Sequence, residues 1–267
     1  MNTQKGGLWL KNIYKDSLPN NPLVTVVMPV FNNEDTLGCA IESVLSQTYN
    51  NIEFIIIDGG STDKTLEVIR KYEDMIDYWQ SEPDKGIADA MNRGVKAAHG
   101  DWIHILNSDD YYASSDCIAR VVKAMGGPKD TFYYFTLHFL EKSGKIRQQK
   151  YPFNWLNRWK LYYSAYIAHP TLFVSKQQYQ AVNYYDDTYK ICGDHDLILK
   201  LCKVFKGCFV DIPVTIMMAG GVSEMNMAKT FGEFKIATIK AGLPSWLAEI
   251  IFKFKLWKHN LRKKNRT

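Results

Sequence analysis

The first half of the chain alternates between short apolar runs and segments with helical spacing. Apolar runs rich in β-branched residues occupy Val24–Val30, Ile52–Asp58 and Trp102–Leu106, and 76–81 has a weaker run of the same kind. Runs of this length and composition indicate buried strands. Between them, apolar residues recur at every third or fourth position, which predicts helices. The predicted helices span 35–47, 62–72 and 87–98. Strands that alternate with helices predict an α/β fold with a mostly parallel central sheet covered on both faces.

The second half of the chain has a less regular pattern. Residues 131–140 and 144–153 predict an antiparallel excursion, and Asp194–Phe205 predicts a helix. The other predicted strands span 171–175 and 207–218. Three regions follow from these patterns. They are an N-terminal extension at 1–22, one α/β domain at 23–223, and a helical, basic C-terminal tail at 224–267.

Composition narrows the class of protein. Apolar residues make up 46% of the chain and charged residues 23%, which are ordinary values for a folded globular protein. The five cysteines form no Cys-x-x-Cys pair, so neither a zinc site nor a disulfide framework is indicated, and a reducing cytoplasm fits best. The chain has no run of about 18 apolar residues, and its first 22 residues lack the apolar core of a signal peptide. We therefore expect a cytoplasmic protein that does not span a membrane.

Polar residues follow three of the predicted strands at the point where each ends. These stretches are Phe31–Glu34, Gly59–Asp63 after the strand-ending Asp58, and Asn107–Asp110. Loops and helix N-termini meet at the carboxyl ends of parallel strands, so ligands bind there in α/β sheets. Each stretch alone is also typical of a solvated turn. Three of them in register indicate one site.

Five motifs, in this order, resemble those of glycosyltransferase family 2. They read PVFNNEDTL, IEFIIIDGGSTDKT, SEPDKGIADAMNRG, LNSDD and CGDHDLILKL, and they span roughly residues 24–223. Members of that family are inverting enzymes of the GT-A fold that use nucleotide-diphosphate sugars, and many of them build bacterial surface polysaccharides. The order of the motifs makes the resemblance more specific than any one motif. It implies that 23–223 is a GT-A catalytic domain.

The resemblance implies a divalent metal at the LNSDD motif. The family pattern there is Asp-any-Asp, and in this chain Asn107 replaces the first Asp while Asp109 keeps the second. Asp109 is therefore the expected ligand of Mn²⁺ or Mg²⁺, which would neutralise charge on the leaving diphosphate. Asn107 and Ser108 would lie beside the nucleotide sugar. Asp110 would either support Asp109 or cap the next helix.

The resemblance also implies the residues that bind the nucleotide. Asp58 would accept the imide N–H of uracil, and Gly59 would let the backbone approach the base or ribose closely. Pro29, Val30 and Asn32 would form the floor of the nucleotide pocket. Glu34 would join them, or it would be an ordinary acid in the first turn of a helix.

The SEPDKGIADAMNRG motif departs from the family in one position that bears on the diphosphate. The usual Arg is Met91 here, and Lys85 or Arg93 would have to replace it, unless both are solvated surface charges. Asp89 would lie near the donor sugar, with a role on the helix surface as the alternative.

An inverting transfer needs a base that removes the proton of the acceptor hydroxyl. Asp194 matches the family's catalytic carboxylate, and a helix N-cap is its structural alternative. Asp196 is the second choice, because it lies about 200° further around the helix and faces elsewhere. His169 would contact the donor phosphate, the metal or the acceptor, or serve as a structural hydrogen-bonding residue. Residues 217–226 suggest a glycine hinge, with an exposed turn as the alternative.

The C-terminal tail combines an apolar helical face with positive charge. From Lys253 to Thr267 there are seven Lys or Arg residues and no Asp or Glu. The apolar face contains Leu247, Ile250, Ile251, Phe254, Trp257 and Leu261. Such a helix suits an anionic bilayer surface, here the inner face of the cytoplasmic membrane, or it docks on the catalytic domain. Because no nucleic-acid-binding motif accompanies the charge, we expect no nucleic-acid partner.

These features predict an inverting, metal-dependent enzyme that transfers a hexose from a nucleotide sugar, with UDP favoured. The acceptor would be lipid-linked or a growing polysaccharide. Two alternatives remain. A catalytically silent glycan- or nucleotide-binding module would explain Asn107 and Met91. A sugar nucleotidyltransferase would need a Gly-rich, basic loop after the first strand, and PVFNNEDTL lacks one.

Overall fold

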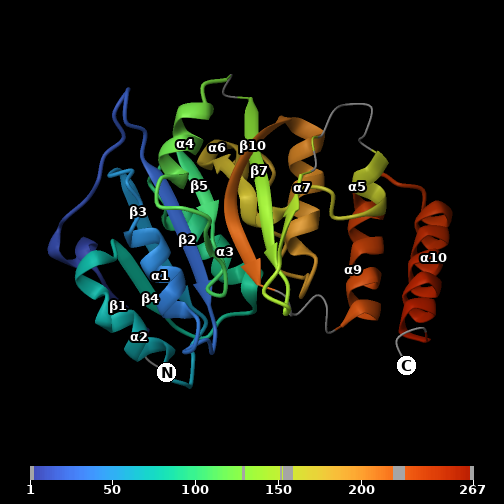
Figure 1. Ribbon diagram of the computed structural model, residues 1–267, viewed down its shortest axis with the longest axis horizontal. Coiled ribbons are helices and arrows are strands. Elements are labelled where there is room, and N and C mark those ends of the chain that lie inside the picture. Colours follow the sequence, from blue (N-terminus) through green and yellow to red (C-terminus); the bar gives the residue numbers. More distant parts are fainter. Residues whose placement is uncertain (1–2, 128–129, 151, 153–158, 219–225, 265–267) are drawn as a thin grey trace.

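The computed structural model describes residues 3–127, 130–150, 152, 159–218 and 226–264. One mixed sheet forms the centre of the molecule, with the strand order β1-β4-β3-β2-β5-β9-β7-β10-β6 and with β8 paired to β7 (Figure 1). The strands are β1 (Gln4–Gly6), β2 (Val24–Val30), β3 (Ile52–Asp58), β4 (Tyr78–Ser81), β5 (Trp102–Ile105), β6 (Tyr111–Tyr112), β7 (Thr131–Leu140), β8 (Ile146–Gln149), β9 (Leu172–Ser175) and β10 (Lys206–Met218).

The parallel pairs lie at the middle of this sheet. Strand β2 pairs in parallel with both β3 and β5, and β3 pairs in parallel with β4. A fourth parallel pair joins β7 to β10, while β9 runs antiparallel between β5 and β7. Every residue of β2 and β3 is buried, as the continuous apolar runs predict. The predicted antiparallel excursion is confirmed as the β7–β8 hairpin.

Helices cover both faces of the sheet. They are α1 (Leu37–Leu45), α2 (Thr65–Lys71), α3 (Ile87–Ala97), α4 (Cys117–Ala124), α5 (Trp159–Tyr163), α6 (Lys176–Ala181), α7 (Gly193–Val204), α9 (Met227–Lys240) and α10 (Ser245–Lys264), with 3-10 turns at Leu8–Lys11, Glu73–Met75 and His169–Thr171. Successive residues of a strand point to opposite faces of the sheet and pack in two separate hydrophobic cores. Val26 packs in a core with α1, α2 and α4, and Val27 packs in another with α3, α7 and α9. The predicted α/β fold class is confirmed.

Two short strands were not predicted from the sequence. Strand β1 belongs to the expected N-terminal extension, yet it pairs antiparallel with β4 and forms an edge of the sheet. Strand β6 follows Asp110 directly and pairs with the end of β10. The prediction that Asp110 caps the next helix is therefore wrong, because a strand comes next and Asp116 is the residue before α4. Both strands are too short to have an apolar period.

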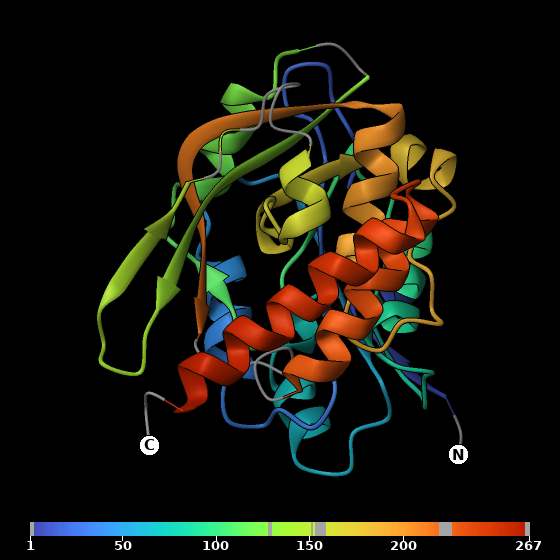
Figure 2. The ribbon, with the colours of Figure 1, turned by 90° about the vertical axis from the view of Figure 1, so that its right-hand side faces the viewer.

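The C-terminal helices lie at the end of the molecule that is opposite to β1 (Figure 1). Helix α9 packs on α7, and α10 lies along α9, as Figure 2 shows from that side. The predicted boundary at 223 falls outside the described residues, as does most of the predicted glycine hinge. Within the described part of the chain, no helix has both the length and the apolar character needed to cross a membrane.

Candidate active site

Hydrogen bonds join the three polar loops that follow β2, β3 and β5. The backbone N–H of Asn32 donates to Oγ of Ser61 at 2.8 Å, and Oδ1 of Asn32 accepts from the backbone N–H of Thr62 at 2.8 Å. Asn32 has a φ of 47°, a left-handed conformation that asparagine tolerates. The amide of Asn33 donates to Oγ of Ser108 at 2.9 Å. The expectation that these strand ends meet at one edge of the sheet is thus met.

The predicted nucleotide residues differ in how accessible they are. Pro29 and Val30 are buried at the end of β2 and pack in the core. Glu34 is exposed, and its Oε2 accepts a hydrogen bond from the backbone N–H of Lys64 at 2.7 Å, next to the start of α2. Glu34 thus joins two loops, whatever contact it makes with a nucleotide.

Asp58 is completely buried at the end of β3. Its carboxylate accepts hydrogen bonds from the hydroxyls of Ser61 at 2.5 Å and Ser81 at 2.6 Å, and from the backbone N–H of Ser61 at 3.1 Å. A contact with uracil therefore requires that one of these serine bonds be exchanged. Gly59 follows, and a Cβ there would lie 2.6 Å from Oδ2 of Asp84. Only glycine fits at this point without a shift of Asp84.

The two candidate cations of the β4–α3 region have different partners. The guanidinium of Arg93 donates to Glu82 at 2.6 Å and to Asp89 at 2.8 Å, so two carboxylates neutralise it. The bond from Arg93 holds the Asp89 carboxylate against the side of α3. Lys85 is exposed, and its Nζ lies 3.8 Å from Oδ2 of Asp187. Of the two, Lys85 has the longer ion pair and the more exposed ammonium group, so it can turn toward a diphosphate more readily, while Met91 is buried in the core.

The turn after β5 holds two carboxyl groups in different states. Asp109 is exposed, whereas Asp110 is 1% exposed. Burial, and then the neighbouring Asp109 charge, raise the pKa of Asp110 to about 7. Nδ2 of Asn107 donates a hydrogen bond to Oδ2 of Asp110 at 3.1 Å. The other oxygens of these two side chains, Oδ1 of Asn107 and Oδ1 of Asp110, are buried and have no hydrogen-bond partner among the residues that the structure describes.

This turn fits a hard divalent cation better than it fits a plain bend. Buried oxygens without partners are costly, and Mg²⁺ or Mn²⁺ prefers oxygen ligands. The exposed Asp109 carboxylate adds a charge beside them. Among the described residues, no three His, Cys, Asp or Glu side chains converge. The protein would therefore supply few ligands, and the diphosphate and water would supply the others.

Asp194 lies in the first turn of α7 and is half-buried. It lines a cavity of about 410 Å³ between α7, α9 and α10. Burial raises the pKa of its carboxyl to about 6, which is the range of a general base that works near neutral pH. The N-terminus of α7 packs on that of α3, since a Cβ at Gly193 would lie 3.8 Å from Cβ of Ala88. Lys190 also donates to the carbonyl of Lys85 at 2.8 Å.

Asp196 has a different environment. It is 4% exposed, and its Oδ2 lies 3.0 Å from Nζ of Lys200, one turn further along α7. It is not among the residues that line the cavity. The geometry therefore favours Asp194 over Asp196 as a base.

His169 is buried beneath the site. It is 5% exposed, and its Nε2 shares a hydrogen bond of 2.8 Å with the hydroxyl of Tyr185, which lies 3.2 Å from the hydroxyl of Tyr179. Burial lowers the pKa of His169 to about 3, so the ring is neutral at physiological pH. This environment favours the structural alternative for His169.

Several residues around Asp194 were not singled out from the sequence. The most notable is Lys255 of α10, whose Nζ lies 3.5 Å from the ring centroid of Phe234. The ring of His195 stacks on Phe234 at 4.1 Å. From the sequence, Lys255 is only one of the seven basic residues of the tail, because a helical period cannot show which face meets a neighbouring helix. The cavity is lined by Tyr163, Ser164, Ala165, Ile191, Cys192, Asp194, His195, Met227, Thr230, Phe231, Phe234, Lys255, Lys258 and His259.

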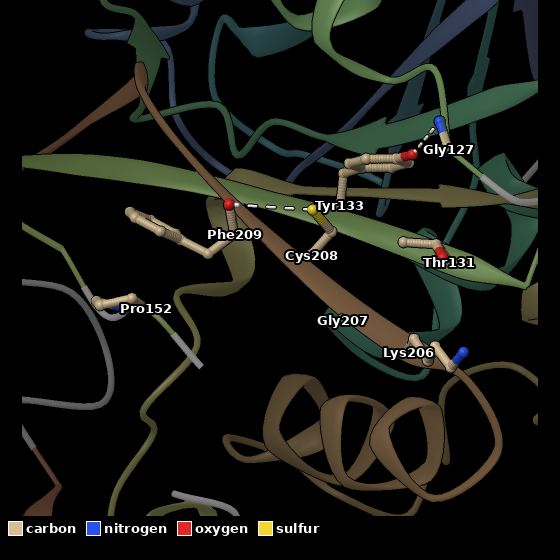
Figure 3. A pocket seen from close by; sticks show the side chains of 8 residues that line it. All are labelled: Gly127, Thr131, Tyr133, Pro152, Lys206, Gly207, Cys208 and Phe209. Atoms are coloured by element: carbon tan, nitrogen blue, oxygen red, sulfur yellow. Dashed lines mark hydrogen bonds between the residues drawn. The ribbon is translucent and has the colours of Figure 1, made fainter. Parts of the chain in front are cut away.

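A second cavity, of about 490 Å³, opens at the other end of the sheet (Figure 3). It lies at the starts of the parallel strands β7 and β10, whereas Asp110 lies near the end of β10. The hydroxyl of Tyr133, which lines it, accepts a hydrogen bond from the backbone N–H of Gly127 at 2.7 Å. Among the described residues that line it, the ionisable groups are Tyr133, Lys206 and Cys208, and none of them is a carboxylate.

Comparisons with known proteins identify the family to which the chain belongs. Residues 25–179 match the family model of glycosyl transferase family 2. The chain is 33% identical over 198 residues to an uncharacterized glycosyltransferase of Mycobacterium tuberculosis, covering 73% of this chain and 72% of that protein. It is 28% identical over 189 residues to a PGL/p-HBAD biosynthesis glycosyltransferase of Mycobacterium bovis, covering 67% and 69% of the two chains.

Solved structures share the fold at low sequence identity. Staphylococcus aureus TarS 1-349 in complex with UDP-GlcNAc has a TM-score of 0.64 at 16% identity, covering 88% of this chain and 71% of that one. The mannosyltransferase PcManGT from Pyrobaculum calidifontis, in complex with GDP-Man and Mn²⁺, has a TM-score of 0.62 at 16% identity, covering 95% and 80%. With the match to the family model over more than half of its length, the chain belongs to glycosyl transferase family 2 and is a glycosyltransferase of the GT-A fold.

Proposed function

We propose that the protein is an inverting, metal-dependent hexosyltransferase that uses a nucleotide-diphosphate sugar. Its acceptor is a lipid-linked glycan or a growing polysaccharide of the cell surface. Two structural neighbours were solved with nucleotide sugars, one with UDP-GlcNAc and one with GDP-Man and Mn²⁺, which supports this class of donor. The mycobacterial relative named for PGL/p-HBAD biosynthesis supports a glycolipid acceptor.

The joining of the strand-end loops is the observation that carries the proposal. Hydrogen bonds from Asn32 and Asn33 hold the loop after β2 to those after β3 and β5. These bonds hold Asp58, which ends β3, and Asp109, which lies in the turn after β5, at one edge of the sheet on either side of β2. Because the loops at this edge are already fixed by hydrogen bonds within the protein, they lose little conformational entropy when a ligand binds. We assign the base to the Asp58 and Gly59 side of this edge and the diphosphate to the Asp109 side.

Asp194 is the proposed general base. Its carboxylate takes the proton of the acceptor hydroxyl while that oxygen bonds to the anomeric carbon of the donor sugar. The bond from this carbon to the diphosphate breaks on the opposite face, so the configuration inverts. With a pKa of about 6, the carboxyl is mostly ionised at pH 7 and is still a useful base.

Asp109, with the free oxygens of Asn107 and Asp110, is the proposed holder of Mn²⁺ or Mg²⁺. Such a cation, when bound, offsets the charge that develops on the leaving diphosphate. Lys85 is exposed at the start of α3 and adds a positive charge on the side of the donor. It takes the part that the family's Arg would take at Met91.

A peripheral contact with an anionic membrane surface completes the proposal. Five apolar residues of α10, Trp246, Ile250, Phe254, Trp257 and Leu261, are between 41% and 65% exposed. They fall within about 80° of one another on a helix of 3.6 residues per turn. Lys253 lies at the edge of this outer apolar face and is exposed. Aromatic side chains flanked by lysines are typical of helices that lie in a bilayer interface.

Thermal melting with nucleotide sugars tests the donor site. We expect UDP-sugars with Mn²⁺ to raise the melting temperature more than GDP- or dTDP-sugars, because a ligand that binds only the folded state stabilises it. Asp109→Ala should abolish the portion of this rise in melting temperature that depends on Mn²⁺. Asp74→Ala is the matched control, since Asp74 is 84% exposed and contacts only Lys11. An equal response to Mn²⁺ in wild type and Asp109→Ala would refute the metal assignment.

Slow hydrolysis of the donor separates an enzyme from a silent binding module. A module weakened at Asn107 would bind the nucleotide sugar without cleaving it. We expect Mn²⁺-dependent release of UDP by the wild-type protein and none by Asp109→Ala. Binding without any release of UDP would favour the silent module.

A further inference from the structure

Helix α10 presents a second face to the cavity beside Asp194. Its outer apolar face is exposed, but Ala248 and Lys255 lie on the opposite side, about 140° or more from the centre of that face. Ala248 is 2% exposed. Leu247 and Ile251, which were expected on the same apolar face, are half-buried and lie between the outer face and the inner side. One helix thus borders both the outer surface and the cavity that Asp194 lines.

Lys255 is a cation without an anionic partner. Its Nζ lies 3.5 Å from the ring centroid of Phe234 and 5.5 Å from those of Phe231 and Tyr163. Among the described residues, no carboxylate forms an ion pair with it, whereas the nearby Lys235 pairs with Glu249 at 2.9 Å. Burial lowers the pKa of Lys255 to about 8. A charge that is mostly removed from water and not paired is costly unless a ligand completes the site.

The cavity has two kinds of wall. Asp194 and His195 of α7 form one side, and Lys255, Lys258 and His259 of α10 form the other. Aromatic side chains lie between them, so the space suits an apolar or sugar body that carries a negative group. Ammonium groups bind phosphate as point charges, and a phosphate ester carries up to two negative charges. The lysine side therefore fits a phosphate, and Asp194 faces the part of the same molecule that bears the hydroxyl.

We propose that Lys255, with Lys258, binds a phosphate group of the acceptor in this cavity, so that the acceptor is a phosphorylated lipid or a glycan linked to one. This inference rests on the proposed function and names its acceptor class. In this proposal the outer side of α10 contacts the lipid surface, and its inner side binds the phosphate. With its outer apolar face on a lipid surface, α10 presents Lys255 to a phosphate that projects from that surface.

Binding of farnesyl phosphate tests the proposal directly. Titration calorimetry in the presence of saturating UDP keeps the probe out of the donor site. We expect Lys255→Met to weaken farnesyl phosphate binding by about tenfold or more, and Lys255→Arg to keep most of it. Lys71→Met is the matched control, since Lys71 is exposed on α2, at the end of the molecule opposite to α10, and this variant should bind the probe as wild type does. UDP affinity should be the same in all four proteins.

The outcomes separate this proposal from the proposed function. Unchanged farnesyl phosphate affinity in Lys255→Met, or equal binding of farnesol, would overturn it. Inorganic phosphate that binds as tightly as farnesyl phosphate would identify a free phosphate as the source and overturn the lipid acceptor. If wild type binds farnesyl phosphate through Lys255 but does not bind UDP, the proposed function fails and the phosphate site stands. Should Lys255→Met not fold, wild-type affinity must still fall above pH 8, where Lys255 loses its proton.

Discussion

The amide of Asn107 donates a hydrogen bond to the buried carboxyl of Asp110, with 3.1 Å between Nδ2 and Oδ2. Asn107 stands where the family pattern has an aspartate, so this bond is specific to the amide. An aspartate there would place a third carboxylate beside Asp109 and the already perturbed Asp110. Asparagine at position 107 therefore favours the stability of the metal-free protein, whereas aspartate would favour metal binding.

We expect Asn107→Asp to lower the melting temperature without metal and to raise the affinity for Mn²⁺. The first effect follows from repulsion among carboxylates and loss of the amide donor, roughly 1–3 kcal/mol of unfolding free energy. The second follows because carboxylate oxygens bind hard cations more strongly than amide oxygens. Melting curves with and without Mn²⁺ measure both effects. A variant that is as stable as wild type without metal would contradict the account of this turn.

The carboxyl of Asp194 should control the rate of donor cleavage. Because burial raises its pKa to about 6, the base is protonated below that pH and ionised above it. The rate of UDP release should therefore rise as the pH passes through about 6 and level off near 7. Asp194→Asn should remove this rise of the rate with pH and lower the rate of UDP release by a factor of about 10²–10⁴.

Asp196→Asn is the informative comparison for Asp194. Asp196 pairs with Lys200 and does not line the cavity, so its loss should cost stability while the pH profile stays as in wild type. A profile that disappears in Asp196→Asn and persists in Asp194→Asn would reverse the assignment.

The contact between Gly59 and Asp84 predicts a strict size limit at the nucleotide end of β3. A Cβ at Gly59 would lie 2.6 Å from Oδ2 of Asp84, so Gly59→Ala must push that carboxyl away. Overpacking of this kind costs about 1–3 kcal/mol. We expect lower stability and weaker UDP binding. Gly126→Ala is the control, because a Cβ there meets nothing within 4 Å. Equal melting temperatures for the two variants would show that Asp84 moves freely.

The parts of the fold that the sequence predicts are those in which burial leaves a long signal. Strands β2, β3 and β7 occur at their predicted bounds, because each is a mostly apolar run of seven residues or more. Strand β1, in contrast, reads Gln-Lys-Gly and is held by its pairing to β4, a contact that no local period reports.

The candidate site shows the same division. Motif order identifies Asp58, Asp109 and Asp194, because the chemistry fixes both residue type and spacing. Their partners are decided by tertiary packing. The serines on Asp58 and the cavity position of Lys255 follow from how separate elements meet, which a single sequence does not encode locally.

The outer apolar face of α10 predicts binding to anionic vesicles. Phe254 and Trp257 are 45% and 55% exposed on this face, and transfer of each into the interface is favourable by about 1–3 kcal/mol. The double variant Phe254→Ser/Trp257→Ser should therefore lower the partition coefficient at least tenfold in a vesicle sedimentation assay. Met75→Ser removes a similarly exposed apolar side chain from the turn between α2 and β4, and it should have no effect. Binding should also weaken with salt, because lysines contribute through charge. Equal sedimentation of both variants and wild type would exclude α10 as the membrane contact.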